Sequence, residues 1–209
     1  MIYELALFAG AGGGLLGSRL VDIETVCAVE IDKYKRAILA ARQNDGSLAP
    51  FPIWCDIRTF GAKQLEWLKI ASSQLIITGG FPCQFASRAA RGRNTATNLW
   101  PEMLRIIKEV QPRYVLAENV DGAFAVLVKA AADLEALGYG CALLAVPAST
   151  MGAPHHRARY WLVADTNKDS ESMRAQYEKA SKLRFVTTTF WKDNPCTVRV
   201  ANGMAHRMD

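Results

Sequence analysis

Short apolar runs alternate with helical segments along most of this chain, and this alternation limits the possible folds more than any other feature. Apolar runs typical of strands lie at residues 3–8, 25–29, 52–54, 75–78, 114–117, 142–146 and 159–164. Helical patterns fill the intervals at residues 15–20, 33–43, 62–69, 101–110 and 121–137. This order predicts an α/β fold with a doubly wound, mostly parallel sheet. Such a sheet binds ligands beyond the carboxyl ends of its strands, so the residues that follow each strand are the functional candidates.

The composition is that of a folded, soluble chain. Of the 209 residues, 50% are hydrophobic and 22% are charged, which excludes a disordered protein. No apolar run approaches the roughly 20 residues that a membrane helix needs. The five cysteines include no CxxC pair and the three histidines do not cluster with them, so we expect no disulfide framework, no metal and a reducing cytoplasm. The net charge of +5 hints at a polyanionic partner.

A glycine-rich loop at residues 9–14 follows the first predicted strand. Residues 12–17 fit the pattern GxGxxG, and Glu30 ends the next apolar run 18 residues after Gly12. Glycines let a backbone approach a ligand closely, and the N-terminus of the following helix favours negative charge. By itself this pattern fits a nicotinamide dinucleotide as well as an adenosyl cofactor, and a tight strand-to-helix turn is the plainer alternative.

Two carboxylates follow the second and third predicted strands. Glu30 would accept hydrogen bonds from both hydroxyls of a ribose, or it caps the next helix. Asp56 would accept a hydrogen bond from an adenine amino group, or it begins a turn or a helix. The sequence alone leaves these alternatives open.

Reactive side chains follow the later strands. Cys83 stands behind a Gly-Gly-Phe-Pro turn, where a thiol can act as a nucleophile, although a buried space-filling cysteine is the alternative. Glu118 directly follows four apolar residues, so its carboxyl must be hydrogen-bonded or functional. Arg157 and Arg159 alternate as in a strand and would share one face, or they belong to a solvated edge strand.

Taken together, these segments resemble the DNA (cytosine-5) methyltransferase family, in the same order from residue 7 to about residue 162. Phe-Ala-Gly-Ala-Gly-Gly at 8–13 resembles its cofactor loop, Pro-Cys-Gln at 82–84 its catalytic signature and Glu-Asn-Val at 118–120 its second catalytic motif. His-His-Arg-Ala-Arg at 155–159 resembles its Gln-x-Arg-x-Arg element, with His155 in place of the usual Gln. The resemblance implies S-adenosyl-L-methionine as cofactor and double-stranded DNA as partner. The cofactor-binding residues that it implies are Phe8, Ala9, Gly10, Gly12, Gly13, Glu30, Ile31, Asp56, Ile57 and Pro82.

The same resemblance implies roles for four catalytic residues. Cys83 would add to carbon 6 of a cytosine that has left the duplex. Glu118, with its pKa raised in a desolvated pocket, would hold a proton at ring nitrogen 3. Arg159 would bind the ring carbonyl oxygen and orient Glu118, with Arg157 nearby.

The segment 85–98 resembles the family's mobile loop after the catalytic cysteine, and it holds three arginines and no acidic residue. Such a loop would contact DNA phosphates without reading sequence, although a solvated basic loop is the alternative. The implied DNA-binding residues are Gln84, Ser87, Arg88, Arg91 and Arg93.

The C-terminal part departs from the family pattern. We expect a catalytic and cofactor-binding domain at residues 1–165, a short remnant or insertion at 166–194 in place of a target-recognition region, and the start of a returning segment at 195–209. Because the sequence stops before the family's last motif, Gly-Asn-Ala, we expect a truncated product, a fragment or one half of a split enzyme completed by a second polypeptide.

Three other functions stay open. The first is a non-catalytic remnant, or one half of a split methyltransferase, that binds DNA without turnover by itself. The second is an RNA cytosine methyltransferase, because the chemistry on the base is the same. The third is a nicotinamide-dependent oxidoreductase, which leaves Cys83 and the paired arginines unexplained. We expect a prokaryotic or phage origin and a cytoplasmic location.

Overall fold

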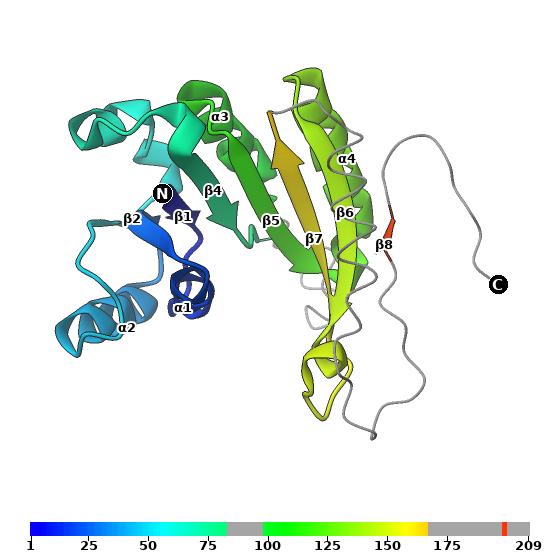
Figure 1. The fold of residues 1–209 in the computed structure, drawn as a ribbon, viewed down its shortest axis with the longest axis horizontal. Coiled ribbons are helices and arrows are strands. Elements are labelled where there is room, and N and C mark those ends of the chain that lie inside the picture. Colours follow the sequence, from blue (N-terminus) through cyan, green and yellow to red (C-terminus); the bar gives the residue numbers. More distant parts are fainter. Residues whose placement is uncertain (83–97, 167–197, 200–209) are drawn as a thin grey trace.

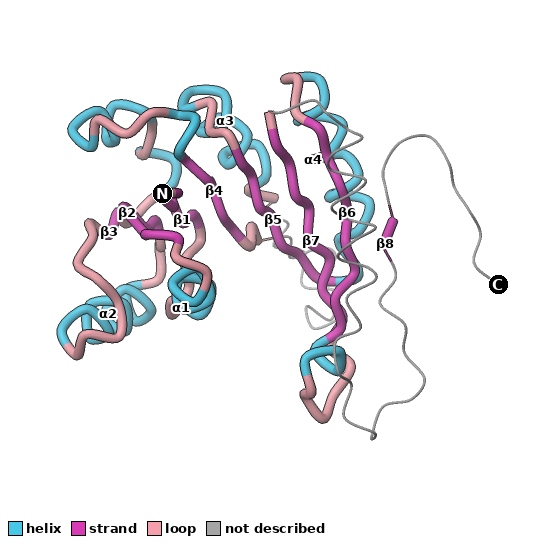
Figure 2. The backbone as a smooth tube through the Cα atoms, in the orientation of Figure 1, coloured by secondary structure: helices cyan, strands magenta, loops and turns pink. Residues whose placement is uncertain are grey.

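The computed structural model describes residues 1–82, 98–166 and 198–199, which form one mixed, mostly parallel sheet (Figures 1 and 2). The strands lie in the order β3-β2-β1-β4-β5-β7-β6-β8. From β3 to β5 the neighbours pair in parallel, whereas β7 runs antiparallel between β5 and β6. The predicted fold class is therefore confirmed. The strands are β1 (Ile2–Leu7), β2 (Ile23–Val29), β3 (Ile53–Trp54), β4 (Leu75–Gly79), β5 (Tyr114–Val120), β6 (Gly140–Pro147), β7 (Ala158–Asp165) and β8 (Val198–Arg199).

Helices cover both faces of the sheet. Leu5 and Leu7 of β1 belong to one buried cluster, which includes residues of α3 and α4, whereas Ala6 belongs to a second cluster with Leu15 of α1 and Leu39 of α2. Successive strand side chains point to opposite faces, so the two clusters are the two sides of the sheet. Figure 1 shows α1 and α2 grouped near β1 and β2, and α4 alongside β6. The α-helices are α1 (Gly13–Leu20), α2 (Lys33–Asn44), α3 (Trp100–Val110) and α4 (Phe124–Ala136).

Local sequence signals account for several helix ends. The Asp32 carboxylate caps α2 and accepts hydrogen bonds from the N–H groups of Tyr34 at 2.8 Å and Lys35 at 3.3 Å. Pro101 lies in the first turn of α3, where its missing N–H is no loss. Gln111 ends α3 in the left-handed conformation, with φ of 48°.

Some predicted elements differ from those observed. The strand predicted at 114–117 continues to Val120, because β7 pairs along it as far as the partners Val120 and Arg159. The helix predicted at 62–69 is a 3-10 helix, and the one predicted at 121–137 begins with a 3-10 turn before α4. The 3-10 elements are η1 (Ile57–Thr59), η2 (Ala62–Leu68), η3 (Ser72–Gln74), η6 (Asp121–Ala123) and η7 (Ala148–Met151).

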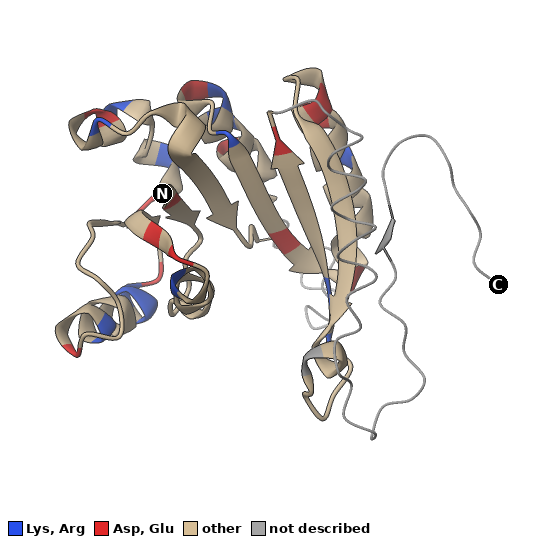
Figure 3. Cartoon of the chain, viewed as in Figure 1, with Lys and Arg blue, Asp and Glu red and all other residues tan. Residues whose placement is uncertain are grey.

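Charged residues lie mostly on helices and loops, and few interrupt the strands (Figure 3). Glu4 of β1 is an exception, because it is only 1% exposed. Its Oε1 accepts hydrogen bonds from the hydroxyls of Ser18 at 2.9 Å and Thr78 at 2.6 Å, and its Oε2 accepts one from Thr25 at 2.8 Å. A buried carboxylate is tolerated only when it is hydrogen-bonded, and here the partners come from α1, β4 and β2.

The described residues include neither a membrane-spanning helix nor a cluster of metal ligands. No helix in them combines the length and the apolar character that crossing a bilayer requires. The same residues hold no cluster of three or more His, Cys, Asp or Glu side chains that could bind a metal ion.

Candidate active site

The loop between β1 and α1 turns the chain at the carboxyl edge of the parallel strands. Phe8, Gly10 and Gly12 adopt left-handed angles, with φ of 55°, 58° and 85°. The N–H of Gly12 closes the turn by donating to the carbonyl of Ala9 at 3.1 Å. A Cβ at Gly10 would meet no atom within 4 Å, whereas one at Gly12 would lie 2.8 Å from Leu39 Cδ2. Gly10 therefore leaves room for a ligand, and Gly12 is required by its backbone angle and by packing against α2.

Glu30 lies directly after β2 and is buried, with 6% of its surface exposed. Its Oε2 accepts a hydrogen bond from the N–H of Gly10 at 2.7 Å, and its Oε1 accepts one from the N–H of Asp32 at 2.9 Å. Each carboxylate oxygen has two lone pairs, so one on each oxygen is free of these two bonds. The carboxylate is thus held in a fixed orientation beside the glycine loop.

Asp56 lies after β3 and caps η1. Its Oδ1 accepts a hydrogen bond from the backbone N–H of Arg58 at 3.0 Å, and its Oδ2 forms an ion pair with the Arg58 guanidinium at 2.8 Å. Hydrogen bonding to Arg58 lowers the pKa of the Asp56 carboxyl. The helix-start alternative from the sequence therefore describes its local structure, and the carboxylate stays ionised at neutral pH.

The other predicted cofactor residues differ in exposure. Ile31, next to Glu30, is 62% exposed, and Gly13 is exposed at the start of α1. Phe8 and Pro82 are half-buried. Ile57, in contrast, belongs to the hydrophobic core. Ile31 and Gly13 thus have open surface, whereas the Ile57 side chain serves packing.

Glu118 and Arg159 meet across two neighbouring strands. Arg159 Nε lies 2.8 Å from Glu118 Oε1, and both side chains are half-buried. Glu118 lies within β5 and not after it, as the sequence had suggested, because β7 extends the pairing of β5. Gly80, just after β4, lies beside the same carboxylate, since a Cβ there would be 2.9 Å from Glu118 Oε2.

The electrostatics of Glu118 are a balance of opposing effects. Burial raises the pKa of its carboxyl, and the positive charges of Arg159 and then Arg157 oppose this rise. The net result is a pKa above the usual range. A carboxyl in this setting keeps its proton at higher pH than an exposed one, as a group that donates a proton requires.

Arg157 does not share a strand face with Arg159, contrary to the sequence interpretation. β7 begins at Ala158, and Arg157 precedes it with an unusual φ of 34° and an exposed side chain. The adjacent turn is closed by the N–H of Ala148, which donates to the carbonyl of His156 at 2.7 Å. Alternation holds only inside a strand, so it did not apply to this pair.

Asn119 is a residue whose role the sequence reasoning missed. It is buried on the opposite face from Glu118, and its Nδ2 donates to the carbonyl of Phe81 at 3.0 Å. The N–H of Leu99 donates to the carbonyl of Pro82 at 3.3 Å. These bonds fix the chain directly before residue 83. The signal that could have indicated this was an amide next to Glu118 at the end of an apolar run.

The predicted nucleophile and DNA-contacting residues lie outside the described residues. These are Cys83, Gln84, Ser87, Arg88, Arg91 and Arg93. Among the described cysteines, Cys27 and Cys141 are buried, and desolvation raises their pKa values to about 11 and about 12. Cys55 is exposed. Neither buried thiol is a candidate nucleophile, since the thiolate is the reactive form.

The strand order, with β7 antiparallel between β5 and β6, defines the class of the protein by its fold as a doubly wound, Rossmann-like α/β protein. The S. pombe Dnmt2 methyltransferase structure matches with a TM-score of 0.63, over 90% of this chain and 57% of that chain, at 20% identity. The family model for C-5 cytosine-specific DNA methylase matches residues 3–195, so the chain belongs to that family.

Curated relatives include bacterial type II methyltransferases. M.PspPI of Psychrobacter sp. is 33% identical over 144 residues, which are 64% of this chain and 32% of that protein. M.HgiDI of Herpetosiphon aurantiacus is 34% identical over 162 residues, which are 75% of this chain and 50% of that protein. The chain therefore spans about a third of the length of the first relative and half of the length of the second.

Proposed function

We propose that this chain carries the catalytic part of a DNA (cytosine-5) methyltransferase, which transfers a methyl group from S-adenosylmethionine to carbon 5 of a flipped-out cytosine. Membership in the family supports the reaction class. The observation that carries the proposal is the Glu118–Arg159 pair, because a carboxyl with a raised pKa lies there beside Gly80, three residues before Cys83.

The residues at the ends of β1, β2 and β3 fit the adenosyl part of this cofactor. The oriented carboxylate of Glu30 suits two ribose hydroxyls, and the open space at Gly10 suits close backbone approach. The ionised carboxylate of Asp56 suits an adenine amino group, and Phe8 would pack against the adenine ring. When bound, the cofactor supplies an electrophilic methyl group.

The protein's own residues would activate the base. The Cys83 thiolate donates an electron pair to carbon 6 of the cytosine, and the Glu118 carboxyl gives its proton to ring nitrogen 3, so that negative charge does not build up on the ring. Arg159 donates hydrogen bonds to the ring carbonyl oxygen and holds Glu118 in place. Loss of the carbon 5 proton to water then expels the Cys83 sulfur as a thiolate, and nitrogen 3 returns its proton to the Glu118 carboxylate, which restores the neutral aromatic ring.

The partners we propose follow from the same family. Double-stranded DNA is the substrate, and Gln84, Ser87, Arg88, Arg91 and Arg93 contact its backbone. A second polypeptide that contributes to target recognition is a further proposed partner. A bacterial or phage cytoplasm is the proposed location.

The test is to trap the covalent intermediate. The chain is incubated with S-adenosylmethionine and duplex DNA that contains 5-fluorocytosine, whose fluorine cannot leave as a proton does. A stable protein–DNA adduct at Cys83 is expected by denaturing electrophoresis and peptide mass spectrometry, and none with Cys83→Ser. The assay is repeated with a C-terminal fragment of a relative. No adduct in either case contradicts the catalytic proposal.

A second candidate is a DNA-binding remnant without turnover, and the net charge of +5 is the observation that favours it. It predicts salt-dependent DNA binding and no methyl transfer. Calorimetry with S-adenosylmethionine distinguishes the two, because the remnant needs no cofactor and the enzyme does.

A further inference from the structure

An arginine from a helix holds the segment that carries Glu30. Arg36 of α2 donates from one guanidinium nitrogen to the carbonyl of Glu30 at 3.0 Å and to the carbonyl of Ile31 at 2.6 Å. These two carbonyls come directly after the end of β2 at Val29. The arginine therefore fixes the backbone from which the buried Glu30 carboxylate projects.

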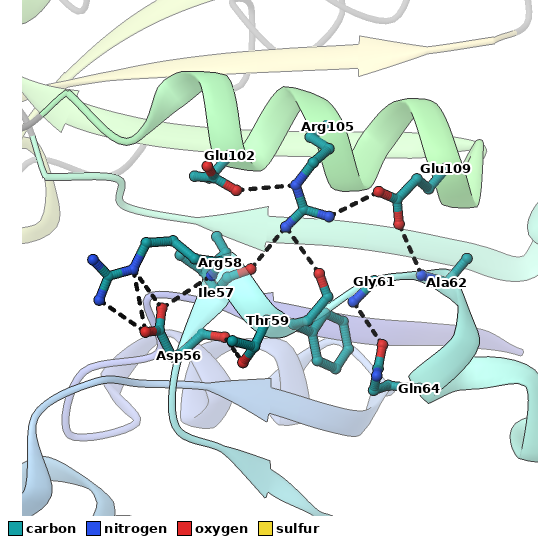
Figure 4. Close-up of polar contacts among 11 residues, drawn as sticks. Asp56, Ile57, Arg58, Thr59, Gly61, Ala62, Gln64, Glu102, Arg105 and Glu109 are labelled. Atoms are coloured by element: carbon teal, nitrogen blue, oxygen red, sulfur yellow. Dashed lines mark hydrogen bonds and ion pairs between the residues drawn. The ribbon is translucent and has the colours of Figure 1, made fainter.

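A second arginine does the same for the segment after β3. Arg105 of α3 donates from one nitrogen to the carbonyls of Ile57 at 2.8 Å and Phe60 at 2.9 Å (Figure 4). These residues follow Asp56, and the fold of this segment sets the position of the Asp56 carboxylate.

Arg105 is itself held by two carboxylates on its own helix. Its Nε lies 3.0 Å from Glu102, and another nitrogen lies 2.8 Å from Glu109. The second oxygen of Glu109 accepts a hydrogen bond from the N–H of Ala62 at 3.0 Å (Figure 4). Side chains of α3 therefore hydrogen-bond to both ends of the 57–62 segment. A Cβ at Gly61 would lie 2.5 Å from this carboxylate, which shows how closely the segment approaches the helix.

A third arginine makes the same kind of contact elsewhere. Arg19 of α1 donates to the carbonyls of Gly46 at 3.1 Å and Ser47 at 2.5 Å. Arg19 and Gly46 line a cavity together with Met1 and Ile23, which lie at the amino ends of β1 and β2. This is the edge opposite the strand ends that carry Glu30, so Arg19 provides a matched control.

We propose that Arg36 and Arg105 are positioning residues of the adenosine site, Arg36 for the ribose carboxylate Glu30 and Arg105 for the adenine carboxylate Asp56. This inference rests on the proposed binding of S-adenosylmethionine. A planar guanidinium with several donors can bridge two carbonyls in an irregular segment, which an ammonium group does less rigidly. Neither arginine touches the cofactor in this proposal, and both act through the backbone.

The test measures binding by calorimetry, with S-adenosylhomocysteine as the probe. Arg36→Ala and Arg105→Ala are each expected to weaken binding on the order of tenfold, whereas Arg19→Ala stays within about twofold. The affinity of Arg105→Lys for S-adenosylhomocysteine is expected to lie between those of the wild type and Arg105→Ala. Thermal denaturation without ligand identifies the temperature range in which every variant is folded, and binding is compared there.

A second probe distinguishes the effect of Arg105 on adenine recognition from the effect of Arg36 on the ribose carboxylate. S-inosylhomocysteine lacks the exocyclic amino group from which Asp56 would accept a hydrogen bond, so the wild type should bind the adenine compound more tightly. Arg105→Ala should reduce this preference, because the Asp56 carboxylate is displaced. Arg36→Ala should weaken the binding of both compounds by the same factor, so the ratio of their affinities should not change. A purely structural role would not move this ratio.

The outcomes are distinguishable. If the wild type binds S-adenosylhomocysteine and both alanine variants bind it within twofold, the inference is wrong and the proposed function stands. If Arg19→Ala weakens binding as much as the other two, the effect is general and the inference is wrong. If the wild type binds neither probe, the proposed function fails and the inference fails with it. If Arg105→Ala does not fold, Arg105→Lys replaces it in the test. The inference about Arg105 is then wrong if Arg105→Lys keeps both the affinity and the adenine preference of the wild type.

Discussion

Single residues define the chemistry at the edge of the sheet, and Glu118 is the most informative of them. Its carboxyl is partly desolvated and faces two arginines, of which Arg159 is in direct contact. The opposing effects leave its pKa raised. The folded protein therefore binds the Glu118 proton up to a higher pH than the unfolded chain does.

A pH dependence of stability follows from this shift. Between the ordinary carboxyl pKa and the raised one, the folded state holds more protons than the unfolded state, so the contribution of Glu118 to stability falls as pH rises through that window. Glu118→Gln removes this contribution. Urea denaturation of both proteins from pH 4 to pH 8 should show that the wild type loses stability relative to Glu118→Gln across the window. Parallel pH curves would contradict the shift.

The described cysteines should differ in reactivity, because two are buried with raised pKa values and one is exposed. In a variant with Cys83→Ser and Cys196→Ser, we expect one fast equivalent of Ellman's reagent in the native state at pH 8, and three after denaturation. Peptide mapping should place the fast site at Cys55. Fast labelling at Cys27 or Cys141 would be inconsistent with the structure.

Elements are joined at this sheet by a few polar contacts between distant parts of the chain. Glu4 connects β1 with α1, β2 and β4 through three hydroxyl groups. Hydrogen bonds to a charged group each contribute about 1.5–3 kcal/mol, and removal of the carboxylate leaves the hydroxyls unpaired.

Glu4→Ala is therefore expected to lower the free energy of unfolding by roughly 3 kcal/mol or more. The matched control is Glu24→Ala, because Glu24 lies on the neighbouring strand β2 and is exposed. The control should change stability by no more than about 0.5 kcal/mol. Chemical denaturation measures the free energy of unfolding of both variants. If Glu4→Ala loses no more stability than the control, the Glu4 network contributes little.

At the scale of the whole molecule, ligand binding should stabilise the folded chain. A ligand at 100 times its Kd adds about 2.7 kcal/mol to stability. For a chain of this size, that corresponds to an increase in Tm of roughly 5–10 °C. S-adenosylhomocysteine is expected to give this shift, and NADH is not. Glu30→Gln should remove most of the shift, and a shift with NADH alone would instead favour the oxidoreductase alternative.

The parallel half of the fold was predictable from sequence because its signals are local. Apolar runs with β-rich residues, and a helix whose first turn carries Pro101, depend on neighbours only a few positions away. The glycine loop and Glu30 were identified for the same reason, since ligands bind where such strands end. The family assignment needed only the order of these segments.

The candidate site was less predictable because its contacts are not local. The apolar pattern predicted that Glu118 follows a strand, whereas the insertion of antiparallel β7 places it within β5. The same insertion separates Arg159, which contacts Glu118, from Arg157, which precedes the strand. No periodicity indicates which strand will pair with which.

The amino-acid sequence by itself determined the alternating elements, the glycine turn and the order of the candidate residues, because short-range sterics and hydrophobic periodicity act along the chain. Only the tertiary structure decided that Arg159 lies 2.8 Å from Glu118 and that Arg105 holds the carbonyl of Ile57 from 48 positions away. Such contacts depend on how the strands and helices pack, and packing is a property of the whole fold.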